Sequence, residues 1–328
     1  MRDPLRPANA RLAVAAEAGA AGAATSSLED VYREHGRYIW GLCYRMTGAA
    51  TDADDLVQET FARALASPPP DTTAPWRPWL VRVAMNLARD RLRRRKRAPY
   101  VGPWLPSPVE TDEPGDGTPD GQLDPEHRYG LLESVSFAFL MACEALTPRQ
   151  RAVLLLRDVL DYSVEETARA LALSEANVRT THHRARAAME AYDAARRPPS
   201  ATLRDETRAA LEGFLAALAT GDVGRVEALL SPDASTTNDT NGDYRAALNV
   251  VTGGNRVARF FLGLMKKVPP ARIEYRPVNG MPAYVVTVPE PPPKIAPRLV
   301  FRCELAADGR IQQIHLVVAK AKLHALSA

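Results

Sequence analysis

The stretch LTPRQRAVLLLRDVLDYSVEETARALALSEANVRTTHHRARAAM (146–189) contains two helix-start signals followed by a basic helix. Ser163 and Glu166 form a capping box that opens a short helix, and Ser174 is a good N-cap for the next one. The turn LALS joins the two. Short helices joined in this way form a helix-turn-helix, whose second helix enters the major groove of DNA. The stretch therefore predicts a DNA-binding domain.

Helical spacing divides the second helix into two faces. We expect Val178, Ala185 and Met189 to point inward. The remaining polar side chains are left to reach DNA: Asn177, Arg179, Thr180, Thr181, His183, Arg184 and Arg186. Arginine and asparagine can read guanine and adenine edges, and other basic residues hold phosphates. The alternative is a basic helix that is only solvated. His182 and His183 are adjacent, so they lack the i, i+4 spacing of a metal pair.

A second strong helix signal lies far upstream, in TDADDLVQETFARAL (51–65). Thr51 is the expected N-cap, and three aspartates follow where the helix dipole favours acids. The expected buried stripe is Val57, Phe61, Ala64 and Leu65. A separate face carries Asp55, Gln58, Glu59 and Ala62. From spacing alone, the simpler interpretation of that face is a solvated one.

The helix predicted over WRPWLVRVAMNLARDRLRRRKR (76–97) ends in a dense run of basic residues. That density exceeds what helix capping needs and is typical of phosphate binding. Its expected apolar stripe is Leu80, Val83, Ala84, Leu87 and Leu92. Trp76, Trp79 and Asn86 lie near this charge, and an unstacked base can lie on an aromatic ring. Core packing is the alternative role for each tryptophan.

Composition narrows the class of protein further. A chain of 328 residues predicts two or three domains, and 46% hydrophobic residues are ample for packed cores. Three isolated cysteines without a CxxC pattern indicate a reducing cytoplasm and argue against a disulfide scaffold or a metal site. No run of about 18 apolar residues is present, so we expect no membrane span and no membrane partner.

Changes in composition predict the domain boundaries. Residues 1–27 have the composition of a disordered tail. Residues 28–97 and 131–197 are two helical domains, joined by a linker at 98–130 that is rich in proline and acids. Residues 203–328 begin with helices and end with short strands, which predicts an α+β domain.

Together the segments DADDLVQETFARAL, WLVRVAMNLARDRLRRR and 146–189 resemble an extracytoplasmic-function (group IV) RNA polymerase sigma factor, with only sigma domains 2 and 4. The resemblance implies two all-α domains: a helical bundle (28–97) and a helix-turn-helix domain (131–197). Two departures stand out. Ala172 occupies the turn position where the family usually has glycine. The loop SPPPDTTAP (67–75), stiffened by its prolines, precedes the tryptophans, so recognition of the −10 element is expected to differ from that of relatives.

The resemblance also assigns partners and site residues. It implies binding to core RNA polymerase, through the β′ coiled coil and the β subunit, and to promoter DNA. The core-binding residues would be Asp55, Gln58 and Glu59. The residues at the −10 element would be Trp76, Trp79, Asn86, Arg89 and Arg93, and those at the −35 element Asn177, Arg179, Thr180, His183 and Arg184.

The C-terminal part, 203–328, resembles the SnoaL-like branch of the NTF2-like fold, an α+β cone, as found in sigma factors of the SigJ-type group. WLPSP (104–108) stands where that group has a WLPEP-like motif. By this resemblance Trp104, Leu105 and Pro106 would dock the tail domain onto the sigma portion. Two further motifs of the group appear only in altered form, as DTNGDYR (239–245) and AKAKL (319–323).

The resulting hypothesis is a cytoplasmic sigma factor that is regulated in cis by its tail. It needs no catalytic residue and no cofactor. The alternative is a helix-turn-helix regulator fused to a ligand-binding or enzymatic SnoaL-like domain. Asp239, Asp243 and His315 are the candidate pocket residues for such chemistry, but they offer no base–nucleophile pairing. A small ligand in the cone is more plausible than catalysis, because this fold usually makes a pocket.

Overall fold

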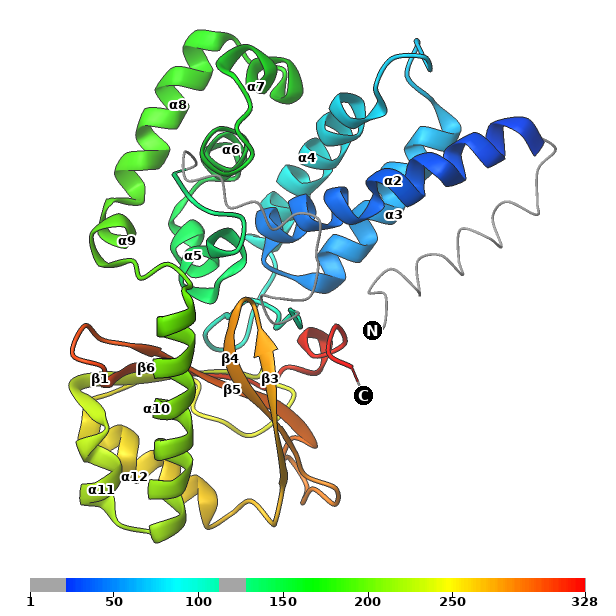
Figure 1. The fold of residues 1–328 in the computed structure, drawn as a ribbon. Helices are drawn as coiled ribbons and strands as arrows, with labels where there is room; N and C mark the ends of the chain where they lie inside the picture. The colour runs from blue at the N-terminus through cyan, green and yellow to red at the C-terminus, as the bar shows by residue number, and fades with distance from the viewer. Residues whose placement is uncertain (1–21, 112–127, 328) are drawn as a thin grey trace. The chain divides into compact units, whose positions relative to one another are not determined.

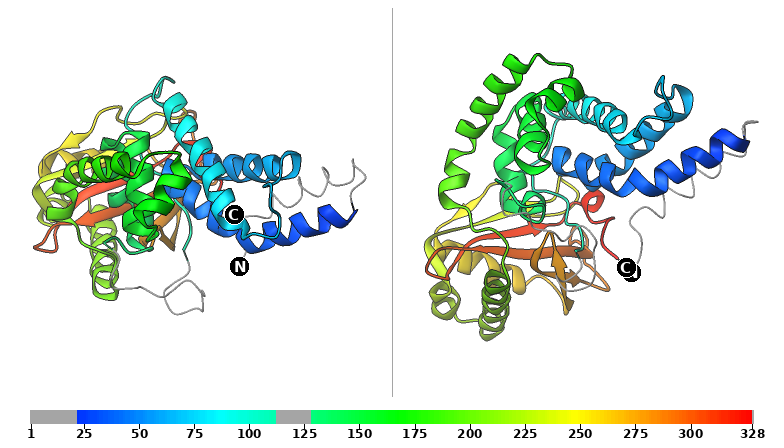
Figure 2. Two further views of the ribbon diagram at one scale, coloured as in Figure 1. Left: turned by 90° about the horizontal axis from the view of Figure 1, so that it is seen from above. Right: turned by 45° about the horizontal axis from the view of Figure 1, so that its top comes forward.

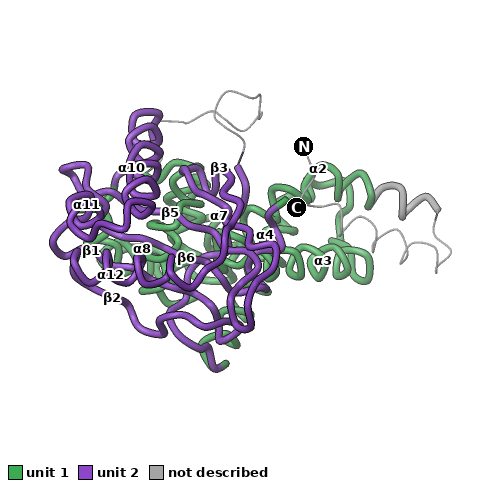
Figure 3. The backbone as a smooth tube through the Cα atoms, turned by 90° about the horizontal axis from the view of Figure 1, so that it is seen from below, with its two compact units in different colours: residues 1–98, 122–196, 327 green, residues 99–121, 197–326, 328 purple. Residues whose placement is uncertain are grey.

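A computed structural model describes residues 22–111 and 128–327. The chain forms two compact units, drawn in different colours in Figure 3. The first unit contains residues 1–98 and 122–196, and the second contains residues 99–121 and 197–326. Within the described residues, no helix combines the length and the hydropathy needed to cross a membrane.

The N-terminal half of the first unit is a bundle of three long helices (Figure 1). These are α2 (Gly22–Thr47), α3 (Ala50–Ala66) and α4 (Trp76–Arg95). The predicted stripe residues Val57, Phe61 and Ala64 are buried between them, as expected. Residues 1–21, most of the predicted disordered tail, lie outside the described residues. The helix α2 starts at Gly22, so residues 22–27 are helical, as their alanine content favours.

Two details of the predicted helix 51–65 were wrong. The N-cap position is Ala49, not Thr51, and it makes no side-chain cap bond. Instead the Thr47 hydroxyl, at the end of the preceding helix, accepts a hydrogen bond from the Ala49 amide at 3.3 Å. Leu65 is 50% exposed, because it falls on the outer face of α3 rather than in the buried stripe.

The C-terminal half of the first unit is built from shorter helices. They are η1 (Glu133–Val135), α5 (Phe137–Ala142), η2 (Cys143–Ala145), α6 (Pro148–Leu154), the π-helical turn η3 (Leu155–Val159), α7 (Val164–Leu171), α8 (Glu175–Ala188) and α9 (Glu190–Ala195). The predicted capping box at Ser163 and the cap at Ser174 are both present. A second capping box, between Thr147 and Gln150, opens α6.

The second unit packs helices against one face of a curved sheet (Figures 1 and 2). Its helices are α10 (Ala201–Thr220), α11 (Val223–Ala228), α12 (Gly254–Met265) and the short η4 (Lys320–Lys322). The strands are β1 (Leu230–Asp239), β2 (Val251–Thr252), β3 (Arg272–Val278), β4 (Met281–Thr287), β5 (Arg298–Leu305) and β6 (Ile311–Val317). Their order in the sheet is β2-β1-β6-β5-β4-β3, and β1 pairs with β6 in parallel.

The core of this unit lies between the helices and the sheet. Phe214 of α10, Phe261 of α12 and Phe301 of β5 stack there with ring centroids 5.3–6.0 Å apart. Ile314 and Leu316 of β6 point to the same side and are buried among them. Aromatic and branched side chains thus occupy the side of the sheet where a ligand was predicted, and the ligand stays a prediction.

The helices predicted in 203–230 and 244–267 and the strands predicted in 272–318 are confirmed. Strand β1 was not predicted, because LSPDASTTND contains residues that are poor strand formers. Its pairing with β6 shifts register between Leu230 and Ser235, which accommodates the Pro-Asp step. The domain boundary at 203 was also wrong. Residues 99–111, predicted as part of a linker, belong to this unit.

Candidate nucleic-acid interface

The face of α3 predicted to bind polymerase is open to solvent. The Asp55 side chain is 61% exposed, and its carboxylate lies 3.3 Å from the Arg91 guanidinium. Glu59 pairs with Arg63 one helical turn away, at 2.7 Å. Leu65 continues this face, since it follows Asp55 and Gln58 at helical spacing. The surface therefore combines acidic, amide and apolar groups.

The first turn of α3 is held by its neighbours. Arg91 of α4 donates to the Asp52 carboxylate at 2.5 Å, and the Trp40 indole of α2 donates to Asp54 at 2.6 Å. These two aspartates join the bundle together. They leave Asp55 as the member of the aspartate cluster that faces outward.

The predicted −10 residues lie along α4. Trp76 and Trp79 pack edge to face, with ring centroids 6.2 Å apart, and both are half-buried. Asn86 is also half-buried, and its side-chain oxygen accepts a hydrogen bond from Arg89 at 3.3 Å. Arg93 is exposed and pairs with Asp90 at 2.8 Å. The tryptophans and Arg93 are accessible to a nucleic acid.

Arg89 differs from the other predicted −10 residues because it is buried. Its guanidinium also donates to the Leu171 carbonyl of α7, at 3.4 Å. Burial lowers the pKa of Arg89, and the positive charges of Arg93 and Arg149 lower it further. Arg89 thus marks the centre of an electropositive region.

The helix-turn-helix presents its second helix, α8, as the sequence predicts. Val178, Ala185 and Met189 are fully buried on its inner side. The five predicted −35 residues all lie exposed on the outer side: Asn177, Arg179, Thr180, His183 and Arg184. Arg179 is partly engaged by Glu175 at 2.7 Å. In the turn, Ala172 adopts the left-handed conformation with φ of 52°.

Asp158, which the sequence analysis did not single out, fixes the position of α8. Its buried carboxylate accepts hydrogen bonds from Arg186 at 2.6 Å and interacts with the His182 ring at 2.8 Å. Burial alone would raise the pKa of Asp158, but these two partners outweigh it and lower the pKa. The expectation that Arg186 reaches DNA was therefore wrong, because its guanidinium is used to orient the helix.

Arg93 of α4 and Arg184 of α8 line one groove in the first unit. The groove has a volume of about 380 Å³ and is also lined by Thr147, Pro148, Arg149, Gln150 and Thr181. The candidate −10 and −35 surfaces are therefore neighbours in this structure.

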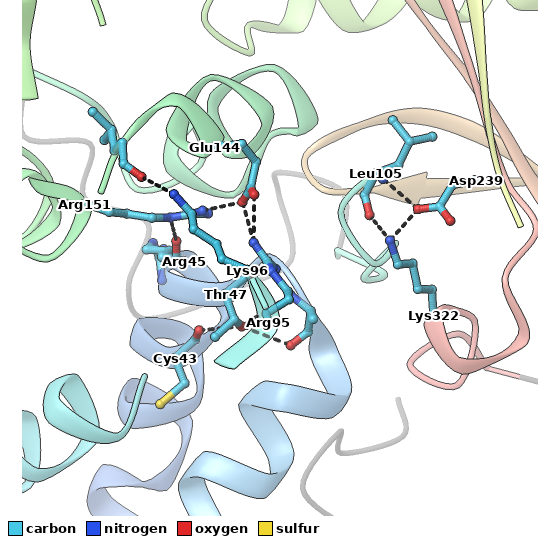
Figure 4. Close-up of polar contacts among 12 residues, drawn as sticks. Cys43, Arg45, Thr47, Arg95, Lys96, Leu105, Glu144, Arg151, Asp239 and Lys322 are labelled. Atoms are coloured by element: carbon cyan, nitrogen blue, oxygen red, sulfur yellow. Dashed lines mark hydrogen bonds and ion pairs between the residues drawn. The ribbon is translucent and has the colours of Figure 1, made fainter. Parts of the chain in front are cut away.

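The WLPSP segment lies in a polar seat within the second unit. The Leu105 amide donates to the Asp239 carboxylate at 2.6 Å, and the Tyr100 hydroxyl donates to its other oxygen at 2.5 Å. The Lys322 ammonium bonds both Asp239 and the Leu105 carbonyl (Figure 4). It also lies 4.5 Å from the centre of the Trp104 ring. Leu105 and Pro106 are buried, and Trp104 is half-buried.

Beyond this seat the segment is bonded to the β3–β4 turn. Val109 and Asn279 exchange hydrogen bonds, each of 2.9 Å, and Glu110 forms a bridge with Val278. Asp239 ends β1, and β6, β5 and β4 separate β1 from β3 in the sheet. Residues 105–109 therefore run across the sheet. Sequence reasoning singled out the segment but did not predict that it is built into the tail domain.

The three candidate pocket residues of the tail have partners within the domain. Asp239 belongs to the seat just described, and the Asp243 carboxylate accepts the Lys320 amide at 3.0 Å. The His315 ring contacts the Arg302 guanidinium at 3.2 Å. Burial, and secondly the Arg302 charge, lower the pKa of His315 to about 3, so its imidazole is neutral near pH 7. These contacts suit structural roles for the three residues.

The same two helical regions match known protein families. Residues 31–98 match the model of sigma-70 region 2, and residues 136–189 match that of sigma-70 region 4. Over 267 residues the chain is 35% identical to the ECF RNA polymerase sigma factor SigJ of Mycobacterium tuberculosis, covering 79% of this chain and 80% of that protein. The chain belongs to the extracytoplasmic-function (ECF) RNA polymerase sigma factors.

Two further comparisons extend the similarity of this ECF sigma factor beyond region 4. The probable ECF sigma factor SigI of M. tuberculosis is 28% identical over 90% of this chain and 95% of its own length. The crystal structure of M. tuberculosis SigJ superposes with a TM-score of 0.68 at 27% identity, covering 89% of this chain and 97% of that one. The C-terminal domain is thus of the SigJ type. Family membership also means that the protein binds RNA polymerase and promoter DNA to initiate transcription, which favours the sigma factor over the helix-turn-helix regulator.

Proposed function

We propose that the ECF sigma factor reads the promoter −35 element with the exposed face of α8. The observation that carries this proposal is the division of that helix into two sides. Val178, Ala185 and Met189 are buried on one side, while Asn177, Arg179, Thr180, His183 and Arg184 are exposed on the other. A recognition helix needs a rigid buried side and free polar side chains that can reach base edges and phosphates.

The exposed face of α3 is the proposed contact with the β′ coiled coil of core polymerase. Asp55, Gln58 and Glu59 provide its polar part, as the resemblance implies. The exposed Leu65 adds an apolar group to the same face. An interface of this kind gains specificity from charge and affinity from apolar burial. The contact of region 4 with the β subunit is proposed on family resemblance alone.

The −10 element is assigned to α4. Trp76 and Trp79 offer ring faces on which an unpaired base could stack, and Asn86 is close to them in sequence. Arg93 would hold a phosphate. Arg89 can take part only after it leaves the Leu171 carbonyl.

The SnoaL-like domain is the proposed regulator in cis, acting through the segment 99–111. That segment follows α4 directly and is bonded into the tail domain, so a change in the tail reaches the end of region 2 through a short connection. A small ligand in the cone remains an expectation of the fold.

The substitution Arg184→Ala tests the −35 assignment. Holoenzyme made with the native protein first selects promoters from a random library, and affinities are then measured at fixed salt on a selected promoter and on one with a scrambled −35 element. We expect Arg184→Ala to lose roughly tenfold in affinity for the selected promoter only, since one bidentate base contact contributes about this much.

The matched control is Arg169→Ala, on the exposed side of α7, where the arginine side chain is 71% exposed. It removes the same charge from the same domain and should leave the affinity ratio of the two promoters unchanged. If Arg184→Ala preserved that ratio as well, this arginine would have no role in reading the −35 element.

A further inference from the structure

Regions 2 and 4 share a polar interface inside the first unit (Figure 4). Arg95, at the end of α4, donates to both carboxylate oxygens of Glu144, at 2.7 and 2.8 Å. Arg45 of α2 donates to the Ser134 hydroxyl at 2.7 Å and to the Leu131 carbonyl at 3.2 Å. These bonds join segments 86 to 89 residues apart in the chain. The interface therefore belongs to the tertiary structure and to neither region alone.

Glu144 is the central residue of this interface. Besides Arg95 it accepts a hydrogen bond from Arg151 at 2.7 Å. Arg151 is only 1% exposed, and its guanidinium also donates to the Arg45 carbonyl of region 2 at 3.1 Å. One carboxylate thus neutralises two guanidinium groups, one from each region. Removing it would leave like charges facing each other with little water to screen them.

The closed arrangement conflicts with promoter binding. The −10 and −35 elements lie ~25 base pairs apart, which corresponds to roughly 85 Å along B-DNA at ~3.4 Å per base pair. In this structure the candidate −10 residue Arg93 and the candidate −35 residue Arg184 line a single groove of about 380 Å³. The two regions must therefore separate before both elements can be read.

We propose that the Glu144 carboxylate is a latch that holds regions 2 and 4 in a closed, autoinhibited state, and that its release opens the sigma factor for promoter binding. The proposal rests on the assignment of region 2 to the −10 element and of region 4 to the −35 element. Opening frees Arg95 from Glu144 and Arg89 from the Leu171 carbonyl at the same time. The latch thus couples exposure of the basic end of α4 to separation of the regions.

The ionisation of Glu144 agrees with this geometry. Burial alone would raise its pKa, but Arg151 and Arg95 outweigh burial and hold the pKa below its usual value. A depressed pKa means that the closed state is favoured above the ordinary glutamate pKa. That preference is lost as the pH falls through the depressed value.

The distance between the regions can be measured directly by pulsed EPR on the full-length protein. Spin labels are attached to cysteines introduced by Arg37→Cys on α2 and Ala187→Cys on α8, both at exposed positions. The native Cys43, Cys143 and Cys303 are fully buried, and burial raises their pKa, that of Cys143 to about 11, so they do not compete for the label.

We expect one narrow, short distance in the native protein. With Glu144→Gln, the open fraction should rise roughly tenfold or more, since hydrogen bonds between charged groups are lost. A broad, longer distance should then appear. Glu165→Gln is the matched control, because Glu165 lies on the exposed side of α7 with its side chain 71% exposed. It should keep the native distance.

Arg95→Gln provides a second variant in case Glu144→Gln compromises folding. It removes only the region 2 side of the latch and leaves the pair between Glu144 and Arg151 intact. Distances unchanged in both variants would overturn the proposal. So would a short native distance that persists in holoenzyme transcribing from a promoter. Failure of the promoter assignments would appear instead as altered promoter selectivity data with the distance change intact.

Discussion

Lys322 shows how a single buried charge holds the tail domain together. Its ammonium is bound by Asp239 and by the Leu105 carbonyl. The rings of Trp104 and Tyr100 lie 4.5 and 5.0 Å from it. A buried ammonium is tolerated only when its charge and its donors are matched in this way. Lys322 therefore connects the C-terminal segment, strand β1 and the segment 99–111.

The substitution Lys322→Met should destabilise the tail domain by about 3 kcal/mol, because it leaves the Asp239 carboxylate buried without its cation. Urea unfolding, followed by amide exchange in β1 and β6, measures the change. Lys320→Met is the control, since Lys320 is exposed two residues earlier. It should have almost no effect.

The double substitution Asp239→Asn with Lys322→Met separates charge from packing. The asparagine keeps an oxygen for the Leu105 amide but carries no charge. We expect it to recover most of the lost stability. If the double variant were as unstable as Lys322→Met alone, the role assigned to the ion pair would be wrong.

At the scale of elements, the helix-turn-helix follows its local sequence signals closely. Serine caps start α7 and α8, and the buried and exposed sides of α8 follow helical spacing. The turn between them contains Ala172 at φ of 52°, where glycine would be relaxed. The domain therefore holds an alanine in a conformation that costs an L-amino acid about 1–2 kcal/mol.

The substitution Ala172→Gly should stabilise region 4 by about 0.5–1 kcal/mol, because relief of the left-handed strain exceeds the added chain entropy of glycine. Thermal unfolding of the full-length protein measures it. Ala187→Gly makes the same chemical change on the exposed side of α8 and should destabilise by about 1 kcal/mol. Equal effects of the two substitutions would contradict the assignment of strain to the turn.

Elements with weak local signals were predicted less well. The cap of α3 was misplaced because a threonine outside the helix, Thr47, stabilises its start. Strand β1 was missed because its residues are poor strand formers. The strand exists because β6 offers it a hydrogen-bonding edge, and its Cα partners range from Leu230 with Ile311 to Asp239 with Val317.

At the scale of the whole molecule, the segment 99–111 changes the boundaries of the domains. It precedes region 4 in the chain but belongs to the unit that follows region 4. Leu105 is fully buried there, whereas Trp104 keeps part of its ring exposed. The two neighbours should therefore have separable roles.

The substitution Trp104→Ala should change core-dependent transcription while the tail domain stays folded. It should cost about 1 kcal/mol or less, since the loss includes one partly exposed cation–π contact. Leu105→Ala should instead destabilise the tail domain by about 2–4 kcal/mol, because it opens a cavity in a buried site. Transcription with core polymerase and amide exchange in β1 and β6 are the two measurements. Unchanged transcription with Trp104→Ala at every promoter tested would remove the support for regulation through this segment.

The sequence by itself determined the two sigma regions, the helix-turn-helix and the exposed residues of its recognition helix. These features depend on caps and helical periodicity, which act within a few residues. It also pointed to WLPSP, whose tryptophan and leucine are unusual in a spacer.

Only the tertiary structure decided where WLPSP is seated, that Asp158 orients α8 and that Glu144 joins regions 2 and 4. The partners in the WLPSP seat are as far as 217 residues apart. Periodicity cannot report such contacts, because each charge finds its partner only after separate elements have packed and excluded water. The free energy of these pairs depends on that burial.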